Sequence, residues 1–253
     1  MKRTLSVAMS IALFATLYGC SSPSPAPAPS PTSTTPSASP AKPAVIAGLL
    51  KDYSFDTDPT KLAKPPEVIV NNVSWTTDRF GKSNSAYHFD GQDSRIDYRL
   101  NINPDVMPKL TITAWARPTT VHPAGEGDLG SHTVISHNAG EFQRTLLIDS
   151  RGGGLGWSAF GGDAEVLGSS QVQAGKWTFL AVVYDQDKQT VALYVNNKKV
   201  FEKPGKLSKG ADYVRIGGQP GLDDYFFIGD IDDVKLYSRA LSEAEVQSIF
   251  KQG

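Results

Sequence analysis

Cysteine is almost missing from this sequence: its 253 residues include only one, Cys20. A single thiol can neither form an internal disulfide nor supply the cysteine cluster of a structural zinc site. A basic excess is missing as well, because 25 Lys and Arg residues stand against 26 Asp and Glu residues. Binding to nucleic acid, which depends on basic side chains at the phosphates, is therefore not expected. The 40% of hydrophobic residues still indicates a folded globular protein.

The N-terminal apolar stretch is short for a membrane span, which takes about 20 residues. Lys2 and Arg3 precede an uncharged run at positions 5–17, so residues 1–19 are predicted to be a signal peptide. The run ends in Leu17-Tyr18-Gly19-Cys20, which resembles the bacterial lipobox. That resemblance implies cleavage before Cys20 and lipidation of its thiol. The alternative is an ordinary signal peptide followed by an unrelated thiol.

Residues 20–46 are predicted to be the lipidated Cys followed by a disordered linker. Positions 21–43 contain only Ser, Pro, Ala, Thr and one Lys, and eight of the chain's 17 prolines lie there. Such a segment cannot bury apolar surface, and closely spaced prolines favour an extended chain. With two or more acyl chains on Cys20, the protein would be anchored to the bacterial membrane through lipid only. Ser21 in place of Asp resembles lipoproteins sent to an outer membrane, if the cell has one.

The residue pattern of positions 47–253 is typical of one all-β domain. Short runs rich in β-branched and aromatic residues alternate with Gly, Asn, Asp and Pro, which predicts strands joined by turns. A helix is expected only near the end, where Ser242 and Glu245 form a capping box. Eleven strands in this length predict a two-sheet antiparallel sandwich. The predicted strands are Leu49 to Phe55, Ala86 to Phe89, Arg95 to Tyr98, Leu110 to Arg117, Thr133 to Ser136, Arg144 to Ile148, Gly156 to Phe160, Trp177 to Tyr184, Thr190 to Val195, Tyr213 to Ile216 and Phe226 to Tyr237.

Alternation within the strand Leu110 to Arg117 separates two faces. Leu110, Ile112, Ala114 and Ala116 share one face, and the opposite face carries Thr111, Thr113, Trp115 and Arg117. We expect the first set in the core and the second set beside a concave surface. Residues 185–189 are predicted to be a hairpin loop, and Asn196-Asn197 to form the next turn.

Several segments, taken in order, resemble laminin G-like domains. They are Tyr53-Ser54-Phe55-Asp56, Phe80-Gly81, Ala86-Tyr87-His88-Phe89-Asp90-Gly91, Leu110-Thr111-Ile112-Thr113-Ala114-Trp115, Gly175-Lys176-Trp177, Leu193-Tyr194-Val195-Asn196, and Ile228-Gly229-Asp230-Ile231-Asp232-Asp233-Val234 followed by Arg239-Ala240-Leu241-Ser242. The resemblance spans most of residues 49–250. It implies a concanavalin A-like jellyroll in which the first and last strands pair. It does not choose a function, because lectins, adhesion modules and glucanases share this fold.

Acidic residues in three loops are candidate ligands for a structural calcium ion. Asp56 follows the first strand, while Asp90 and Asp232 lie in acidic clusters. Calcium takes six to eight oxygen ligands, which such loops supply, and the resemblance suggests an ion near the paired first and last strands. The alternative is that these carboxylates accept backbone N–H groups in turns.

Carbohydrate recognition needs an aromatic platform and hydrogen-bonding side chains beside it. Trp115, Trp157 and Tyr225 are candidate platforms, although core packing is the alternative for each. The candidate hydrogen-bonding residues are Arg117, Arg144 and Asp224, with Arg95, Asp149 and Gln219 as further possibilities.

No catalytic residues are predicted. Laminarinase-like glucanases of this fold alternate Glu, Asp and Glu along one strand. The nearest string here, Asp230-Ile231-Asp232-Asp233-Val234, lacks both glutamates and breaks the alternation. The sequence therefore predicts a lipid-anchored jellyroll that binds carbohydrate without cleaving it. The alternative partner is an envelope or extracellular protein, and a glycoside hydrolase comes a distant third.

Overall fold

In a computed structural model of the chain, residues 47–121, 132–151, 155–162, 165–222 and 224–253 are described. The predicted signal peptide, Cys20 and the linker lie outside these residues. The described elements are, in chain order, β1 Leu49–Tyr53, α1 Pro59–Leu62, β2 Val68–Asn71, β3 Ser74–Thr76, β4 Ala86–Asp90, β5 Arg95–Tyr98, β6 Lys109–Pro118, β7 His132–Ser136, β8 Thr145–Asp149, β9 Gly156–Gly162, β10 Glu165–Gln171, β11 Thr178–Asp185, β12 Thr190–Val195, β13 Lys198–Pro204, β14 Val214–Ile216, β15 Ile228–Tyr237 and α2 Glu243–Gln252.

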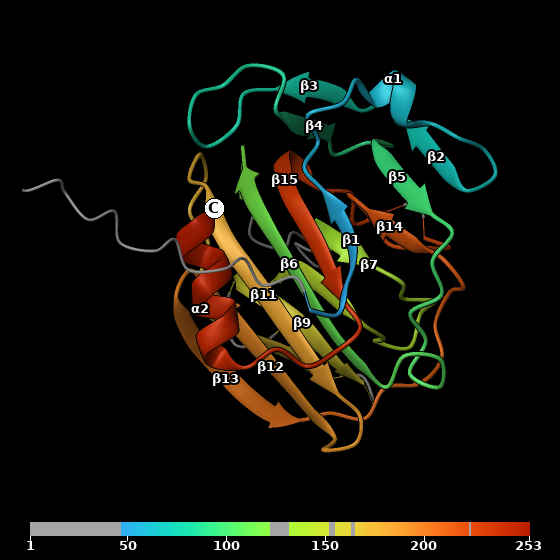
Figure 1. The fold of residues 1–253 in the computed structure, drawn as a ribbon, viewed down its shortest axis with the longest axis vertical. Coiled ribbons are helices and arrows are strands. Elements are labelled where there is room, and N and C mark those ends of the chain that lie inside the picture. The colour runs from blue at the N-terminus through green and yellow to red at the C-terminus, as the bar shows by residue number, and fades with distance from the viewer. Residues whose placement is uncertain (1–46, 122–131, 152–154, 163–164, 223) are drawn as a thin grey trace, which may run out of the picture. The chain divides into compact units, whose positions relative to one another are not determined.

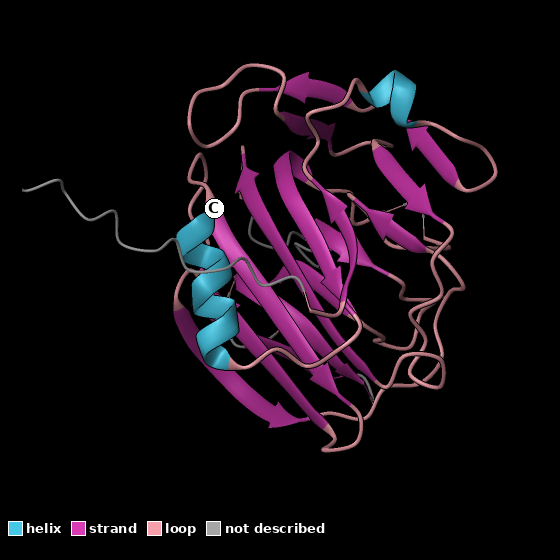
Figure 2. Cartoon of the chain, viewed as in Figure 1, coloured by secondary structure: helices cyan, strands magenta, loops and turns pink. Residues whose placement is uncertain are grey.

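The strands form two antiparallel sheets (Figure 1). Sheet A has the order β13-β12-β11-β6-β15-β4-β3, with β1 paired to β15. Sheet B has the order β10-β9-β8-β7-β14-β5-β2. Every strand pair is antiparallel, and α2 is the short helix near the end of the chain (Figure 2). The predicted all-β fold class, a two-sheet jellyroll sandwich with one short C-terminal helix, is confirmed.

The main core lies between the two sheets. Leu110, Ile112, Ala114 and Ala116 are fully buried in it, as the alternation along β6 predicts. Each fully buried Leu or Ile side chain stabilises the fold by about 1.5–3 kcal/mol through removal of apolar surface from water. The hairpin loop between β11 and β12 and the turn at Asn196, which has φ of 55°, also lie where they were predicted.

A second, smaller core covers the other face of sheet A. There α2 packs Val246 and Ile249 against Phe179 and Tyr237. The predicted capping box is present: Ser242 accepts from the backbone N–H of Glu245, and the Glu245 carboxylate accepts from the backbone N–H of Ser242. Because these contacts satisfy two otherwise unpaired N–H groups, the helix has a well-defined start.

Strand β15 changes neighbours in its middle. Residues 228–231 pair with β4, whereas residues 234–237 pair with β1. Between these segments the register against β6 shifts, and Asp233 adopts a positive φ of 46°. The pairing of β1 with β15 confirms the expectation that the first and last strands meet. It also places Asp232 and Asp233 at an irregular point of the sheet.

Four strands were missed by the sequence analysis, and all four lie at sheet edges. β13 and β3 are the two ends of sheet A, and β10 and β2 are the two ends of sheet B. Strand β13, with the sequence KKVFEKP, carries charged residues where an interior strand would carry apolar ones. Charges on an edge strand discourage pairing with other chains, which removes the apolar alternation that marks a strand in sequence.

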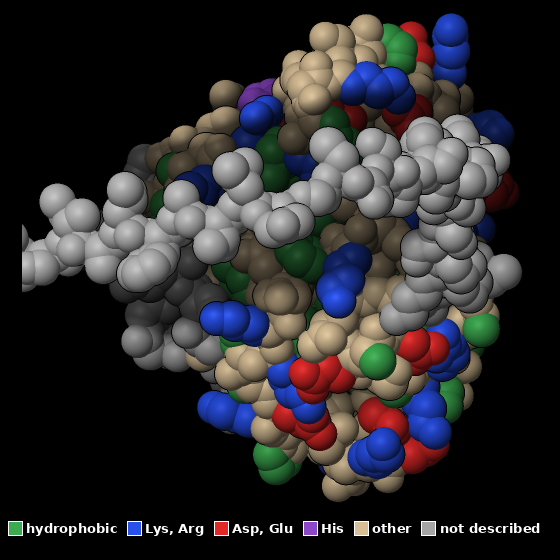
Figure 3. All heavy atoms as spheres, turned by 60° about the vertical axis from the view of Figure 1, so that its left-hand side comes forward, with side chains coloured by type: hydrophobic (Ala, Val, Ile, Leu, Met, Phe, Trp, Pro, Cys, Tyr) green, Lys and Arg blue, Asp and Glu red, His purple; other side chains and the backbone are tan. Residues whose placement is uncertain are grey.

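The surface over β13 and α2 carries charges of both signs, interspersed as Figure 3 shows on its lower part. Lys199 pairs with Glu202 at 2.7 Å and lies 3.6 Å from Glu243, and Arg239 pairs with Glu245 at 2.7 Å. Neither α1 nor α2, the two helices of the described ranges, is long and apolar enough to span a bilayer.

Candidate functional site

Arg144 was predicted to bind ligand, and the structure places it in the interior instead. Its side chain is fully buried, and its guanidinium donates to the carbonyl oxygens of Met107 at 2.7 Å and of Ile102. The same group lies 5.5 Å from the centre of the Tyr184 ring. Burial lowers the pKa of Arg144 to about 10, so the group remains a cation at neutral pH. Arg144 therefore holds the interior together and has no surface from which to contact a ligand.

Trp157 is a core residue, with 1% of its surface exposed among the buried side chains between the sheets. The prediction that it stacks on a sugar is therefore wrong for this fold. Tyr225 and Asp224 lie in the segment before β15, where the Tyr225 carbonyl accepts from the backbone N–H of Thr133 in sheet B. Asp224 is exposed and Tyr225 is half-buried. They do not join Trp115, which belongs to sheet A.

Trp115 and Arg117 share the outward face of sheet A, as predicted, but helix α2 covers part of that face. The Trp115 ring stacks on Phe250 of α2, and the Arg79 guanidinium lies 4.7 Å from the ring centre. The indole is partly buried and already has two protein partners, so the stacking of a sugar on Trp115 stays a prediction. Arg117 pairs with Asp230 at 2.8 Å and lies 4.9 Å from the Trp177 ring.

The three predicted calcium ligands do not come together in one site. Asp56 pairs with Lys82 at 2.8 Å, and this contact lowers the pKa of its carboxyl. Asp90 accepts the backbone N–H groups of Gln92, Asp93 and Ser94, which is the turn-capping alternative. Asp232 pairs with Arg79 at 2.8 Å. Among the described residues, no group of three or more His, Cys, Asp or Glu side chains is placed to hold a metal ion. Calcium binding stays a prediction, without this ligand set.

Arg79 organises the outward face of sheet A. Its guanidinium donates to Asp232 at 2.8 Å, to Asp233 at 2.6 Å and to the Gly253 carbonyl at 2.8 Å. The same group lies 4.5 Å from the centre of the Phe80 ring, on the residue that follows it. These contacts join the loop after β3, the bulge of β15 and the end of α2 around one cation.

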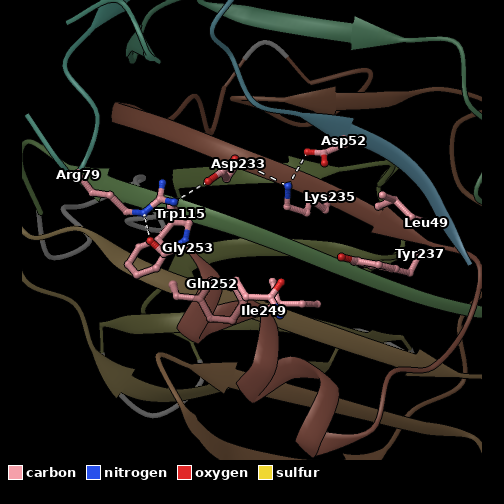
Figure 4. Close-up of a pocket in the computed structure, with 11 residues that line it drawn as sticks. Leu49, Asp52, Arg79, Trp115, Asp233, Lys235, Tyr237, Ile249, Gln252 and Gly253 are labelled. Carbon is pink, nitrogen blue, oxygen red and sulfur yellow. Dashed lines mark hydrogen bonds and ion pairs between the residues drawn. The ribbon is translucent and has the colours of Figure 1, made fainter. Parts of the chain in front are cut away.

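A cavity of about 300 Å³ opens between β1, β15, α2 and Arg79, and we name it the α2 cavity (Figure 4). Its apolar wall includes Leu49, Trp115 and Phe179. Its polar wall includes Lys235, whose ammonium lies 2.6 Å from Asp52 and 3.8 Å from Asp233. The complete lining is Leu49, Asp52, Arg79, Trp115, Phe179, Asp233, Lys235, Tyr237, Ile249, Gln252 and Gly253.

Burial changes the protonation of two groups beside the cavity. Desolvation raises the pKa of Asp232 to about 7, with a further contribution from the neighbouring Asp233 charge. Desolvation also raises the pKa of Tyr237 to about 12, so its hydroxyl stays neutral and can both donate and accept hydrogen bonds. The α2 cavity therefore combines an apolar wall with neutral and charged hydrogen-bonding groups.

Sequence reasoning missed Arg79, Asp52 and Lys235. The expected pairing of the first and last strands could have located Asp52 and Lys235. If β1 pairs with β15, as the resemblance implied, Asp52 stands directly opposite Lys235, and opposite charges in that position attract. Arg79 gave no such signal, because its partners lie more than 150 positions away in sequence.

With this geometry established, two comparisons with known proteins define the class. The profile of the concanavalin A-like lectin/glucanases superfamily matches residues 90–247, more than half of the chain. The protein therefore belongs to this superfamily. No curated protein sequence matches the chain significantly.

Solved structures show the same fold. Domain 4 of AbnA, a GH43 extracellular arabinanase from Geobacillus stearothermophilus solved with arabinotriose, has a TM-score of 0.55 and 19% identity, covering 80% of this chain and 98% of its own. The binding domain of Paraclostridial Mosquitocidal Protein 1 has a TM-score of 0.56 and 18% identity, covering 73% and 47%. The binding domain of Botulinum Neurotoxin DC in complex with SialylT has a TM-score of 0.53 and 14% identity, covering 74% and 46%. This chain spans about half the length of those toxin domains, and identities this low establish the fold alone.

Proposed function

We propose that this protein binds carbohydrate without cleaving it, and that the α2 cavity holds a sugar unit. The observation that carries the proposal is the composition of the cavity wall. Leu49 and Trp115, both partly exposed, can meet the apolar face of a sugar ring, and Lys235 and Gln252 can hydrogen-bond its hydroxyl groups. The solved relatives that carry arabinotriose or SialylT support this ligand class.

The absence of cleavage is part of the proposal. Asp230 and Asp232 lie two positions apart on β15, so their carboxyl groups share one face of the strand. Each of them is paired with a cation, Asp230 with Arg117 and Asp232 with Arg79, both at 2.8 Å. Both side chains are also buried, with 3% of each residue exposed, which leaves neither carboxyl group able to reach a sugar.

The test measures binding to the purified full-length chain in detergent, once with calcium and once with a chelator. The probes are arabinotriose, xylotriose, cellotriose and maltotriose. Lys235→Ala should weaken binding about tenfold or more. Its stability should change by less than about 1 kcal/mol, because Lys235 and Asp52 form a partly exposed ion pair. Lys109→Ala is the matched control, because Lys109 pairs with Asp187 at 2.8 Å and does not line the cavity.

Three results would change the proposal. Equal affinity of the parent and Lys235→Ala would remove the α2 cavity as the site. If the folded parent protein binds none of the probes, the proposal of a sugar ligand is overturned, and an envelope or extracellular protein becomes the favoured partner. Equal affinity and equal melting temperature in calcium and in chelator would end the calcium prediction.

We also propose that the jellyroll is held at the bacterial membrane by lipid on Cys20, in the outer membrane if the cell has one. The support is the lipobox-like Leu17-Tyr18-Gly19-Cys20 and the proline-rich stretch that follows it. Cys20→Ala should move the protein from the detergent phase to the aqueous phase in a phase-partitioning experiment. Unchanged partitioning would show that lipid on Cys20 is not the anchor.

A further inference from the structure

Tyr213 separates two hollows on the outward face of sheet B, away from the α2 cavity on sheet A. One hollow, of about 310 Å³, is lined by Pro66, Ile69, Asp97, Arg99, Asp212 and Tyr213. The other, of about 180 Å³, is lined by Ala139, Ala211, Tyr213, Pro220, Gly221 and Leu222. The partly exposed tyrosine lines both hollows, and we name the two hollows together the Tyr213 groove.

The strand register shows that this groove lies on the face and not at the edge of sheet B. Ile69 stands opposite Asp97, and Asp97 stands opposite Arg215. Residues opposite each other on neighbouring strands share a face, so these three side chains lie in one row. Tyr213 is two positions before Arg215 and lies on the same side, whereas Val214 points into the core.

Arg215 makes the groove rigid. Its guanidinium donates to both oxygens of Asp97, at 2.7 and 3.0 Å, and to the Gln219 carbonyl at 3.0 Å. It also lies 5.9 Å from the centre of the Tyr213 ring. A ring beside a fixed cation loses little conformational freedom when a ligand binds, which favours affinity.

The groove carries charges of both signs. Asp97 neutralises Arg215, and Asp212 carries a negative charge while accepting hydrogen bonds from Asn101 and Asn103. Arg99 is exposed, and the described residues supply no partner for its guanidinium. Arg95 also lies 3.8 Å from Asp97, so the groove and its border offer charged donors and acceptors side by side, which suits a neutral, hydroxyl-rich ligand.

We propose that the Tyr213 groove is a second carbohydrate site, which takes two neighbouring units of a neutral oligosaccharide, one in each hollow with Tyr213 between them. The inference takes its ligand class from the proposed function but assigns a separate site. A peptide adding as a strand is disfavoured, because β5 and β14 each already pair on both sides.

The experiment is calorimetry on the purified full-length chain with the same four trisaccharides. Tyr213→Ala should weaken binding at one site about tenfold or more, so that the fitted stoichiometry falls from two sites to one. Tyr213→Phe keeps the ring and should stay within about threefold of the parent. Arg99→Ala, an exposed change that leaves the fold intact, should weaken the same site by about threefold or more.

The outcomes separate this inference from the proposed function. If Lys235→Ala abolishes binding and Tyr213→Ala binds as the parent does, the groove is not a site and the proposed function stands. If Tyr213→Ala weakens binding and Lys235→Ala does not, the groove is supported and the α2 cavity is excluded. If the folded parent binds none of the four sugars, both the proposed function and the Tyr213 groove as a sugar site are overturned. Unfolding curves of each variant, matched to the parent, show that a loss of affinity is not a loss of structure.

Discussion

The outward faces of the two sheets present aromatic side chains in opposite ways. On sheet A, Trp115 is partly buried: it stacks on Phe250 of α2 and lies 4.7 Å from the Arg79 guanidinium. On sheet B, Tyr213 is half-exposed between two hollows. An aromatic residue at an outward strand position is therefore no evidence of a binding platform by itself. What decides its role is whether a further layer of the protein packs on that face.

A substitution in the interior serves as the reference for the two outward faces. Among these variants, Arg144→Ala should cause the largest loss in the free energy of unfolding. The change leaves the carbonyl oxygens of Ile102 and Met107 buried without their donor and opens a cavity beside Tyr184. We expect a loss of about 4 kcal/mol in the free energy of unfolding, measured with denaturant. Arg99→Ala, on the outward face of sheet B, should change it by less than about 0.5 kcal/mol. A loss below 1 kcal/mol for Arg144→Ala would contradict its interior role.

Trp115→Ala compared with Tyr213→Ala tests the two outward faces directly. Trp115 packs on Phe179 and Phe250, so its removal should lower the free energy of unfolding by about 2–3 kcal/mol. Tyr213→Ala should cost less than about 1 kcal/mol, because its ring is half-exposed. Similar small losses for both, in the same denaturant titration, would mean that α2 does not act as a third layer. The comparison also explains why loss of sugar binding in Trp115→Ala would be uninformative.

The pH dependence of stability gives a further test of the sheet A face. The pKa of Asp232 is raised to about 7 in the folded state, mainly by desolvation. Between about pH 4 and 7 the folded state therefore holds a proton that the unfolded state has released. The stability from this protonation is complete below pH 4 and is lost as the pH rises through 7.

Asp232→Asn removes this titration. The difference in unfolding free energy between the variant and the parent should shift in favour of the variant as pH rises from 4 to 7, by up to about 1.4 kcal/mol per pH unit. The same denaturation series on Asp56→Asn is the control, because Asp56 pairs with Lys82 at the surface. A constant difference for Asp232→Asn across this range would show that its carboxyl is ionised throughout.

The interior strands could be predicted from sequence because burial on one or both faces imposes a visible pattern. In β6, alternation correctly assigned Ile112 and Ala114 to the core. The four edge strands, β2, β3, β10 and β13, escaped prediction: β13 is rich in charge, and β2 and β3, four and three residues long, are too short to show a pattern. The same reasoning accounts for the capping box of α2, which is a local motif with both partners three residues apart.

The site residues divide along a similar line. Arg117 and Trp115 were placed on one outward face, since strand periodicity alone settles that point. Arg144 and Trp157 were taken for ligand residues, because the sequence does not distinguish a buried side chain satisfied by carbonyl groups from one that faces solvent. Arg79 could not be found at all, because its role arises only where the chain brings Asp232 and Gly253 to it.

The sequence by itself determined the fold class, the core face of β6 and the start of α2, because these follow from periodicity and from contacts a few residues apart. The tertiary structure decided which outward faces are covered, which carboxylates are already paired and where cavities remain. Those properties depend on how distant segments meet. Helix α2 closing over Trp115 and Tyr213 standing open on the opposite sheet are both consequences of packing and not of any local pattern.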